Sequence, residues 1–377
     1  MDFDFTEDQE SLRDAVRRWV DKGFGFERRH GIAKAGGRTR EVYGELADLG
    51  LTGLAIPEAH GGMGFGPIEA MVVNEELGRG LVNAPYAHGA IVAPTLLSAA
   101  PADVQAQWLP KMADASALVV LAHQERAARY RLNHVTTRAT NAGNAWTLSG
   151  AKSVVPAGDE ADAFIVPART AGAEGDAAGI GLFLVAKGAA GMAVRGYPTQ
   201  DGARAAELTL ANTPATLIAL DALPVLEQAV DAGIAAICAE AVGVMDRLTA
   251  ITAEYMNTRK QFGVAISTFQ ALRHRIADVK MQLELGRSMS YYASLKLGEA
   301  PAMRRRAIAQ AKYQLGQSMR FVGQQCIQLH GGIGVTDEYI ASHYFKRLTV
   351  LEMTFGDSLH HLGEVSARMQ DTAGVFA

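Results

Sequence analysis

The spacing of hydrophobic residues along the chain changes period twice. From residue 6 to about 118, apolar residues recur at three- and four-residue intervals, as Leu12 and Val16 do, which is typical of amphipathic helices. Thr6 and Gln9 precede this pattern with the spacing of a helix capping box. The stretch EAMVVNEELGRG predicts a further helix that stops at its last glycine. We therefore expect an N-terminal helical domain over residues 1–118.

Between about residue 119 and residue 222 the hydrophobic pattern alternates with a period of two. This alternation, with turn residues at short intervals, is typical of half-buried β-strands. The stretches AWTLSG, AFIVPART, GLFLVA and AAELTLAN predict four short strands, and TNAGNA predicts a hairpin connection. We therefore expect a small β-domain over residues 119–222.

The helical period returns at about residue 223 and continues almost to the C-terminus. Ile234, Ile237 and Ala241 mark one face of a first long helix. Further helices are expected at about 268–296, 302–329 and 357–370. Long consecutive helices with short connections favour an antiparallel bundle, here over residues 223–377. The predicted fold class is α+β, and mostly α.

Composition and charge exclude several classes of protein. The 377 residues are 49% hydrophobic and 20% charged, which is ordinary for a globular protein. A formal net charge of −4 argues against a nucleic acid or an anionic membrane surface as a partner. The N-terminal stretch MDFDFTEDQ lacks the apolar core of a secretory signal, and no apolar run reaches the about 18 residues of a membrane span. We therefore expect a cytoplasmic protein.

The two cysteines offer neither a disulfide framework nor a metal site. Cys238 and Cys326 both fall among apolar positions of predicted helices. Buried free thiols are therefore expected, and no ligand spacing typical of a metal centre occurs.

Two motifs flank the predicted bundle and carry candidate binding chemistry. NTRKQFG ends the first long helix, where Arg259 can hold a pyrophosphate through two N–H groups and Phe262 can pack on a heterocycle. Gln270 follows with amide donors and an acceptor. The second motif is QLHGGIGVT, whose glycines let backbone N–H groups approach an anion. Each motif alone also fits a tight turn or a helix end, but together they indicate a phosphate-containing ligand.

The chain resembles the acyl-CoA dehydrogenase family over essentially its whole length. The stretches IPEAHGGMGFG, TRKQFG…FQALRHRIADV and QLHGGIGVTDEYIASHYFKR carry the resemblance. It implies an N-terminal helical domain, a middle β-barrel-like domain and a C-terminal antiparallel four-helix bundle. It also implies FAD as cofactor, oligomers built on a dimer, and α,β-dehydrogenation of an acyl-CoA thioester.

The resemblance also assigns the candidate cofactor-binding residues. By the family's pattern, the adenosine and pyrophosphate of FAD are bound by Arg259, Phe262, Gln270, Gln328, Gly331 and Gly332. In the family these residues reach across the dimer interface, to a flavin whose ring lies in the neighbouring subunit.

The family's catalytic base is missing from both of its usual places. Phe355 stands where the family has a glutamate, and a phenyl ring cannot accept a proton. Gly233 stands at the family's alternative position. Asp357, just after the first position, and Asp231, just before the second, are candidate substitute carboxylates. The place of Asp357 before SLHHLGEV also fits a helix N-cap. His360 and His361 are expected on the surface of that helix.

The residues that would face the flavin ring also depart from the family. Its T-E-P-x-x-G-S-D segment corresponds to HQERAARY, which has no glycine and two arginines. Its W-I-T segment corresponds to Val154, Val155 and Pro156, and proline offers no N–H to a ring.

The chain thus keeps the residues for the adenosine side of FAD and lacks the base and the ring contacts. Three hypotheses are compatible with this difference. In the first, which we favour, the chain is the auxiliary subunit of a heterotetramer and lends its FAD-binding residues to a homologous large subunit. In the second, it is a self-sufficient homodimer or homotetramer that uses Asp357 as the base. In the third, it is a scaffold without FAD. The complete adenosine-side set counts against the third, and the missing base and Pro156 count against the second.

Overall fold

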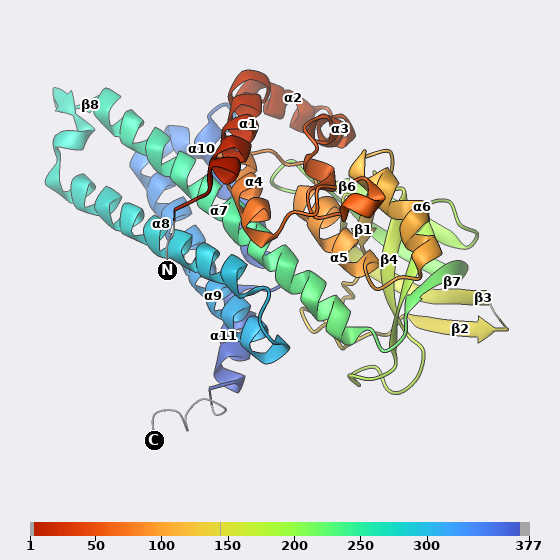
Figure 1. Ribbon diagram of the computed structural model, residues 1–377. Coiled ribbons are helices and arrows are strands. Elements are labelled where there is room, and N and C mark those ends of the chain that lie inside the picture. The colour runs from red at the N-terminus through yellow and green to blue at the C-terminus, as the bar shows by residue number, and fades with distance from the viewer. Residues whose placement is uncertain (1–3, 144, 370–377) are drawn as a thin grey trace. The chain divides into compact units, whose positions relative to one another are not determined.

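The computed structural model describes residues 4–143 and 145–369 (Figure 1). Helices precede and follow a single large sheet, so the fold is mostly helical α+β, as the hydrophobic pattern predicted. The described residues form two compact units. One comprises the described residues of Met1–His30, Pro67–Val82 and Ile234–Ala377, and the other comprises Gly31–Gly66 and the described residues of Asn83–Gly233.

Six α-helices precede the sheet, joined by short 3₁₀ and π-helical turns. They are α1 Glu7–Gly23, α2 Phe26–Lys34, α3 Arg40–Asp48, α4 Pro67–Arg79, α5 Ala93–Leu97 and α6 Ala102–Ala113, with turns at Leu51–Gly53, Glu58–His60 and Ala87–Val92. The predicted capping box is present in α1, because Thr6 Oγ1 accepts from the N–H of Gln9 at 3.2 Å and Gln9 Oε1 accepts from the N–H of Thr6 at 3.0 Å.

The sheet closes into a barrel. Its strands are β1 Val119–Leu121, β2 Arg138–Ala142, β3 Ala145–Pro156, β4 Ala163–Arg169, β5 Ile180–Ala186, β6 Met192–Pro198 and β7 Arg204–Ala219. The order β4-β2-β3-β7-β5 returns to β4 through a β4–β5 pairing, and β1 and β6 pair with β4 and β7 outside this ring. The predicted hairpin is confirmed, since Ala142 at the end of β2 pairs with Ala145 at the start of β3. The four predicted strands correspond to β3, β4, β5 and β7, and the sequence pattern did not identify β1, β2 and β6 as strands.

The C-terminal helices run antiparallel along one another. They are α7 Leu223–Thr258, α8 Gln270–Lys296, α9 Pro301–His330, α10 Ile340–Met353 and α11 Ser358–Ala367. Arg275 of α8 donates to Gln325 of α9 at 2.6 Å, while Ser318 of α9 donates to Gln282 of α8 at 3.1 Å, so the numbering runs in opposite directions. Helix α10 is an addition to the four predicted helices. No helix among the described residues has the length and hydropathy of a membrane span.

Helices α4 and α7 cross at two glycines. A Cβ atom built on Gly78 would lie 2.0 Å from the carbonyl oxygen of Glu240, and one on Gly243 would lie 1.8 Å from that of Glu75. No other residue fits at such separations. This crossing therefore fixes the N-terminal helix α4 against the longest helix of the bundle.

Candidate functional site

The two motifs predicted to bind FAD meet at one end of the bundle. The end of α7, the short strands β8 Lys260–Gln261 and β9 Val264–Ala265, the start of α8 and the end of α9 gather there (Figure 1). Buried Met256, Ile266 and Leu329 pack together and join these segments. Side chains that are distant in sequence thus share one surface.

The four side chains predicted to contact FAD are all exposed on this surface. Arg259 and Gln328 lie at or just after the ends of α7 and α9, and Gln270 is the first residue of α8. Phe262 is 92% exposed at the tip of the β8–β9 hairpin, where its backbone φ is 54°. Its ring meets the ring of Phe269 in an edge-to-face arrangement, with the ring centroids 6.1 Å apart. A flat apolar side chain held in water offers a surface on which a heterocycle can pack.

The glycine turn after α9 leaves room for a ligand. Gly331 has φ 64° and ψ −141°, a conformation that residues with a Cβ rarely adopt. A Cβ atom on Gly331 or Gly332 would meet no described atom within 4 Å, whereas one on Gly334 would lie 2.8 Å from Cβ of His330. The first two glycines therefore face open space and the third packs within the turn. This geometry fits the pyrophosphate of FAD.

A cluster of possible metal ligands lies beside this turn, and the sequence gave no sign of it. His30, Asp337 and His343 place one ligand atom each within 4.8 Å of one another. However, Arg29 Nη1 lies 2.7 Å from Nδ1 of His343, and Lys346 lies 3.2 Å from the Asp337 carboxylate. Two cations at these distances oppose a metal ion. Hydrogen bonds account for the cluster.

Asp357 serves as the N-cap of α11. Its Oδ1 accepts from the N–H of His360 at 2.8 Å. The buried carboxylate of Glu352 accepts from the N–H of Ser358 at 3.0 Å and from its hydroxyl at 2.6 Å. Phe355 lies between these two carboxylates with φ 57°. The carboxylates of Glu352 and Asp357, which lie near the family's base position, thus both accept hydrogen bonds from the first turn of α11.

Replacing Asp357 by asparagine is expected to leave acyl-CoA turnover by the assembled enzyme within about twofold of wild type, because asparagine caps helices as well as aspartate does. Steady-state kinetics on the assembled enzyme tests this. If Asp357 were the base that removes the Cα proton, the near-isosteric change would lower kcat by roughly 10²- to 10⁴-fold without loss of flavin.

His361 was expected on the helix surface, and that prediction was wrong. The residue is 4% exposed, and its Nε2–H donates to the carbonyl of Phe355 at 3.1 Å. Burial, with the nearby charge of Lys312, lowers the pKa of His361 to about 3. Lys312 is itself buried and donates to the carbonyls of Leu351 and Glu352 at 2.7 and 2.8 Å, which caps the end of α10.

Strand β3 corresponds to the family's ring-facing segment, and residues of this strand are hydrogen-bonded within the barrel. Strand β3 bulges near Val154, which has φ 51° and is 47% exposed. Glu207 of β7 accepts from the hydroxyl of Tyr197 at 3.0 Å. Burial would raise the pKa of the Glu207 carboxyl, but hydrogen bonds from Tyr197, Ser153 and the Val154 N–H hold it below its ordinary value. The Glu207 carboxylate is therefore held within the barrel beside the segment Ser153–Val154.

The segment HQERAARY is anchored through a buried carboxylate. Glu125 is 4% exposed and lies 2.6 Å from the ammonium group of Lys152, which is itself fully buried. The backbone N–H groups of Thr136 and Thr137 donate to the same carboxylate at 2.7 and 3.1 Å. Burial opposes the charge on Glu125, yet Lys152 and these hydrogen bonds lower its pKa to about 2. The sequence pattern did not reveal this pair.

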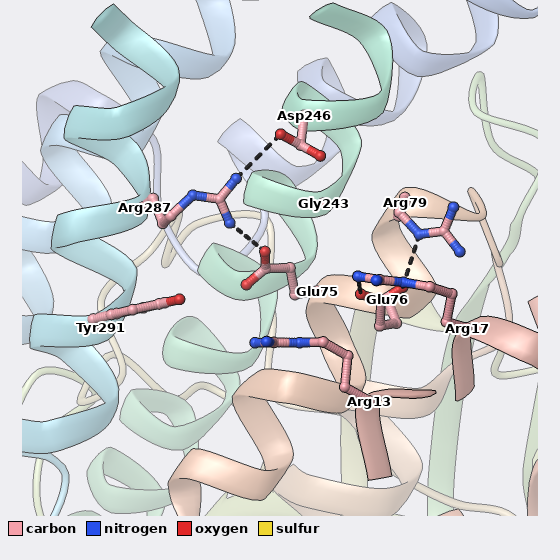
Figure 2. Close-up of a pocket in the computed structure, with 9 residues that line it drawn as sticks. All are labelled: Arg13, Arg17, Glu75, Glu76, Arg79, Gly243, Asp246, Arg287 and Tyr291. Atoms are coloured by element: carbon pink, nitrogen blue, oxygen red, sulfur yellow. Dashed lines mark hydrogen bonds and ion pairs between the residues drawn. The ribbon is translucent and has the colours of Figure 1, made fainter. Parts of the chain in front are cut away.

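A polar cavity of about 260 Å³ lies within the first compact unit (Figure 2). Helices α1, α4, α7 and α8 line it with Arg13, Arg17, Glu75, Glu76, Arg79, Gly243, Asp246, Arg287 and Tyr291. Each of its arginines faces a carboxylate: Arg13 faces Glu10, Arg17 and Arg79 face Glu76, and Arg287 faces Glu75 and Asp246. The cavity is therefore the centre of an ion-pair network that joins four helices.

Comparison with known proteins identifies the class that this fold and surface define. The chain matches the N-terminal domain of acyl-CoA dehydrogenases over residues 6–116, the middle domain over 120–213 and the C-terminal domain over 223–370. It belongs to the acyl-CoA dehydrogenase family, whose members are FAD-dependent oxidoreductases that act on acyl-CoA and form homo- or hetero-oligomers.

Individual relatives resemble the chain along its full length. Acyl-CoA dehydrogenase FadE27 of Mycobacterium tuberculosis is 28% identical over 391 aligned residues, covering 99% of this chain and 100% of that protein. A structure of the Tcur3481-Tcur3483 steroid ACAD is 28% identical with a TM-score of 0.87, over 98% of this chain and 99% of that one. The ChsE4-ChsE5 complex from Mycobacterium tuberculosis is 26% identical with a TM-score of 0.86, over 99% and 100%.

Proposed function

We propose that the chain is the auxiliary subunit of a heteromeric FAD-dependent acyl-CoA dehydrogenase. It lends its adenosine and pyrophosphate site to a homologous large subunit, which carries the catalytic base and the ring contacts. The observation that carries this proposal is the asymmetry between the two halves of the site. The exposed surface around Phe262 and Gly331 keeps every candidate FAD contact, whereas Phe355 and Pro156 replace groups that the reaction needs.

Sequence likeness supports a narrower assignment. The stretches GYPTQDG, FVGQQCIQLHGGIG and YFKRLTVLEMTFGDSLHH resemble the small subunit of pimeloyl-CoA dehydrogenase. Two of the similar structures are named for pairs of proteins, ChsE4-ChsE5 and Tcur3481-Tcur3483. A heterotetramer with a large subunit follows from this likeness, with a dicarboxylic or other bulky acyl-CoA as substrate. The domain boundaries at residues 118 and 222 and a cytoplasmic location belong to the same proposal.

Each residue of the exposed surface has a distinct part in holding the cofactor. Arg259 would hold the pyrophosphate through two N–H groups, and the backbone N–H groups of Gly331 and Gly332 would also donate to it. Phe262 covers one face of the adenine, and Gln270 and Gln328 supply amide groups. FAD, when bound, supplies the electron acceptor of the dehydrogenation.

The proton of the substrate leaves by a route outside this chain. Phe355 offers no acceptor, and the carboxylates of Asp357 and Glu352 are hydrogen-bonded within the start of α11. In the proposed heteromer, the large subunit therefore supplies the base. This arrangement makes the self-sufficient alternative, which requires Asp357 to leave its cap, the weaker one.

The test is to purify the chain alone and co-expressed with a homologous large subunit, and to record flavin absorbance and acyl-CoA oxidation in each sample. The chain alone is expected to hold little FAD, because its homodimer would pair a good adenosine site with a poor ring site. The co-purified complex is expected to be yellow and active. A homo-oligomer with near-stoichiometric flavin and turnover would refute the proposal.

A further inference from the structure

Two hydrogen bonds, one buried and one part-buried, connect helix α2 to the segment that follows the glycine turn after α9. The turn runs from Gly331 to Val335 and leads directly to Asp337. The carbonyl oxygen of Asp337 accepts from Nε2 of His343 in α10 at 2.9 Å. The other ring nitrogen of His343 accepts from Arg29 Nη1 of α2 at 2.7 Å. A connection therefore runs from α2 through one imidazole to the backbone of the turn.

The chemistry of the two outer groups fixes the state of the imidazole. A guanidinium only donates and a carbonyl only accepts. His343 must therefore be neutral, with its hydrogen on Nε2 and its lone pair on Nδ1. No other residue in this place, apart from an amide side chain, offers one acceptor and one donor on opposite sides of a compact group.

The surroundings of His343 restrict any other arrangement. The side chain is 5% exposed, and the rings of Phe26 and His30 contact it with centroid distances of 5.1 and 5.3 Å. Asp337 also lies 3.2 Å from Lys346 and 3.7 Å from Nε2 of His30 through its carboxylate. The imidazole is thus locked between helix α2 and the turn.

We infer that His343 is a positioning residue for FAD binding, acting through Asp337 on the glycine turn. This inference rests on the proposed role of Gly331 and Gly332 in holding the pyrophosphate. Without the hydrogen bond to its carbonyl, the segment from Gly331 to Asp337 loses its hydrogen-bonded link to Arg29 of α2. It then no longer presents its N–H groups in one fixed direction.

The chain of bonds makes FAD binding sensitive to acid. A proton on Nδ1 of His343 would face the N–H of Arg29 and set two donors against each other. Burial lowers the pKa of His343, and the charges of Arg29 and Lys346 act in the same direction against the carbonyl and carboxylate of Asp337. The tie is therefore complete above the ordinary histidine pKa of 6.5 and is lost as the pH falls through the lowered value.

The experiment compares three forms of the complex with its large subunit. They are wild type, His343→Gln, whose amide accepts and donates but does not titrate, and His343→Leu, which can do neither. FAD dissociation constants are measured from about pH 7.5 down to the lowest pH at which the complex stays folded, so that the range extends well below the ordinary histidine pKa of 6.5. His360→Gln, on α11, is the matched control for removal of a titrating histidine.

Wild type and His360→Gln are expected to lose FAD affinity together as the pH falls, while His343→Gln keeps its affinity. His343→Leu is expected to bind FAD about tenfold more weakly at every pH, a typical effect of losing a buried hydrogen bond. The inference is overturned if His343→Gln loses FAD affinity at low pH as wild type does. It is also overturned if His343→Gln binds FAD as weakly as His343→Leu at neutral pH.

Hydrogen exchange of the isolated chain separates this inference from the proposed function. His343→Leu is expected to speed amide exchange across residues 331–337, whereas His343→Gln should not, and neither result depends on FAD or a partner. If exchange responds as expected but Arg259→Ala leaves FAD binding unchanged, the proposed function fails while the tie stands. If exchange does not respond to His343→Leu, the positioning role fails.

Discussion

Replacing Lys152 by methionine is expected to lower the free energy of unfolding by about 3–5 kcal/mol, the usual cost of removing one member of a buried ion pair. Lys152 is fully buried in β3, and its loss would leave the carboxylate of Glu125 charged in a place that water does not reach. Chemical denaturation of the purified chain, followed by circular dichroism, measures the change.

The double variant Lys152→Met with Glu125→Gln is the control for lost packing. It removes the uncompensated charge and is expected to recover a large part of the stability, although the amide oxygen can accept from only one of the two threonines that donate to Glu125. A single Lys152→Met variant within about 1 kcal/mol of wild type would show that the pair is worth no more than a surface salt bridge.

The pH dependence of stability gives a second view of the same pair. The pKa of Glu125 is lowered from 4.5 to about 2 in the folded protein. Its contribution is therefore present above the ordinary glutamate pKa and declines as the pH falls through about 2. In the Lys152→Met variant this acid dependence should shrink, because the folded carboxyl no longer holds its charge so firmly.

Arg259→Ala is expected to weaken FAD binding by the partnered complex by about 1.5–3 kcal/mol, or roughly 10- to 150-fold, as for loss of a charge-assisted hydrogen bond. The side chain is exposed at the end of α7, so the bundle should fold unchanged. Titration of the apo-complex with FAD, monitored by flavin fluorescence, gives the dissociation constant.

Lys260→Ala is the matched control for this experiment. Lys260 is the next residue, is also exposed, and carries the same charge, but it has no assigned contact with FAD. It is expected to shift FAD binding by less than about threefold, as a screened surface charge does. Equal losses of FAD affinity in the two variants would mean that general positive charge holds the cofactor, rather than a two-point hydrogen bond from Arg259 to the pyrophosphate.

The order of helices and strands could be predicted because it follows from local periodicity. Helix α10 was missed although Ala341, Tyr344, Leu348 and Leu351 are buried at helical intervals, because the segment was interpreted only as a motif. Strand β6 was missed for a different reason. Its burial alternates only weakly, and it pairs with β7 alone, so its sequence carries little hydrophobic signal.

The cofactor surface was accessible to sequence reasoning because its residues lie in two short motifs. The structure brings both motifs to one end of the bundle, and the contacts of these residues with FAD stay a prediction. The internal ties were not accessible in the same way. Arg29 and His343 are separated by 314 positions, and no local pattern marks such a pair. The burial of His361 likewise depends on how α11 packs against α9, which helix periodicity alone does not specify.

The exposed ring of Phe262 has a consequence for the life of the newly made chain. A phenylalanine side chain that passes from water into a packed environment gains about 1.5–3 kcal/mol. The unassembled chain carries this ring 92% exposed, and Ile333 and Val335 of the glycine turn are exposed as well. Such apolar side chains favour unspecific association until a partner covers them. If the chain and the partner that covers the ring were made in equal amounts, the ring would be exposed for a shorter time. An excess of unassembled chains would instead be bound by chaperones or degraded by proteases.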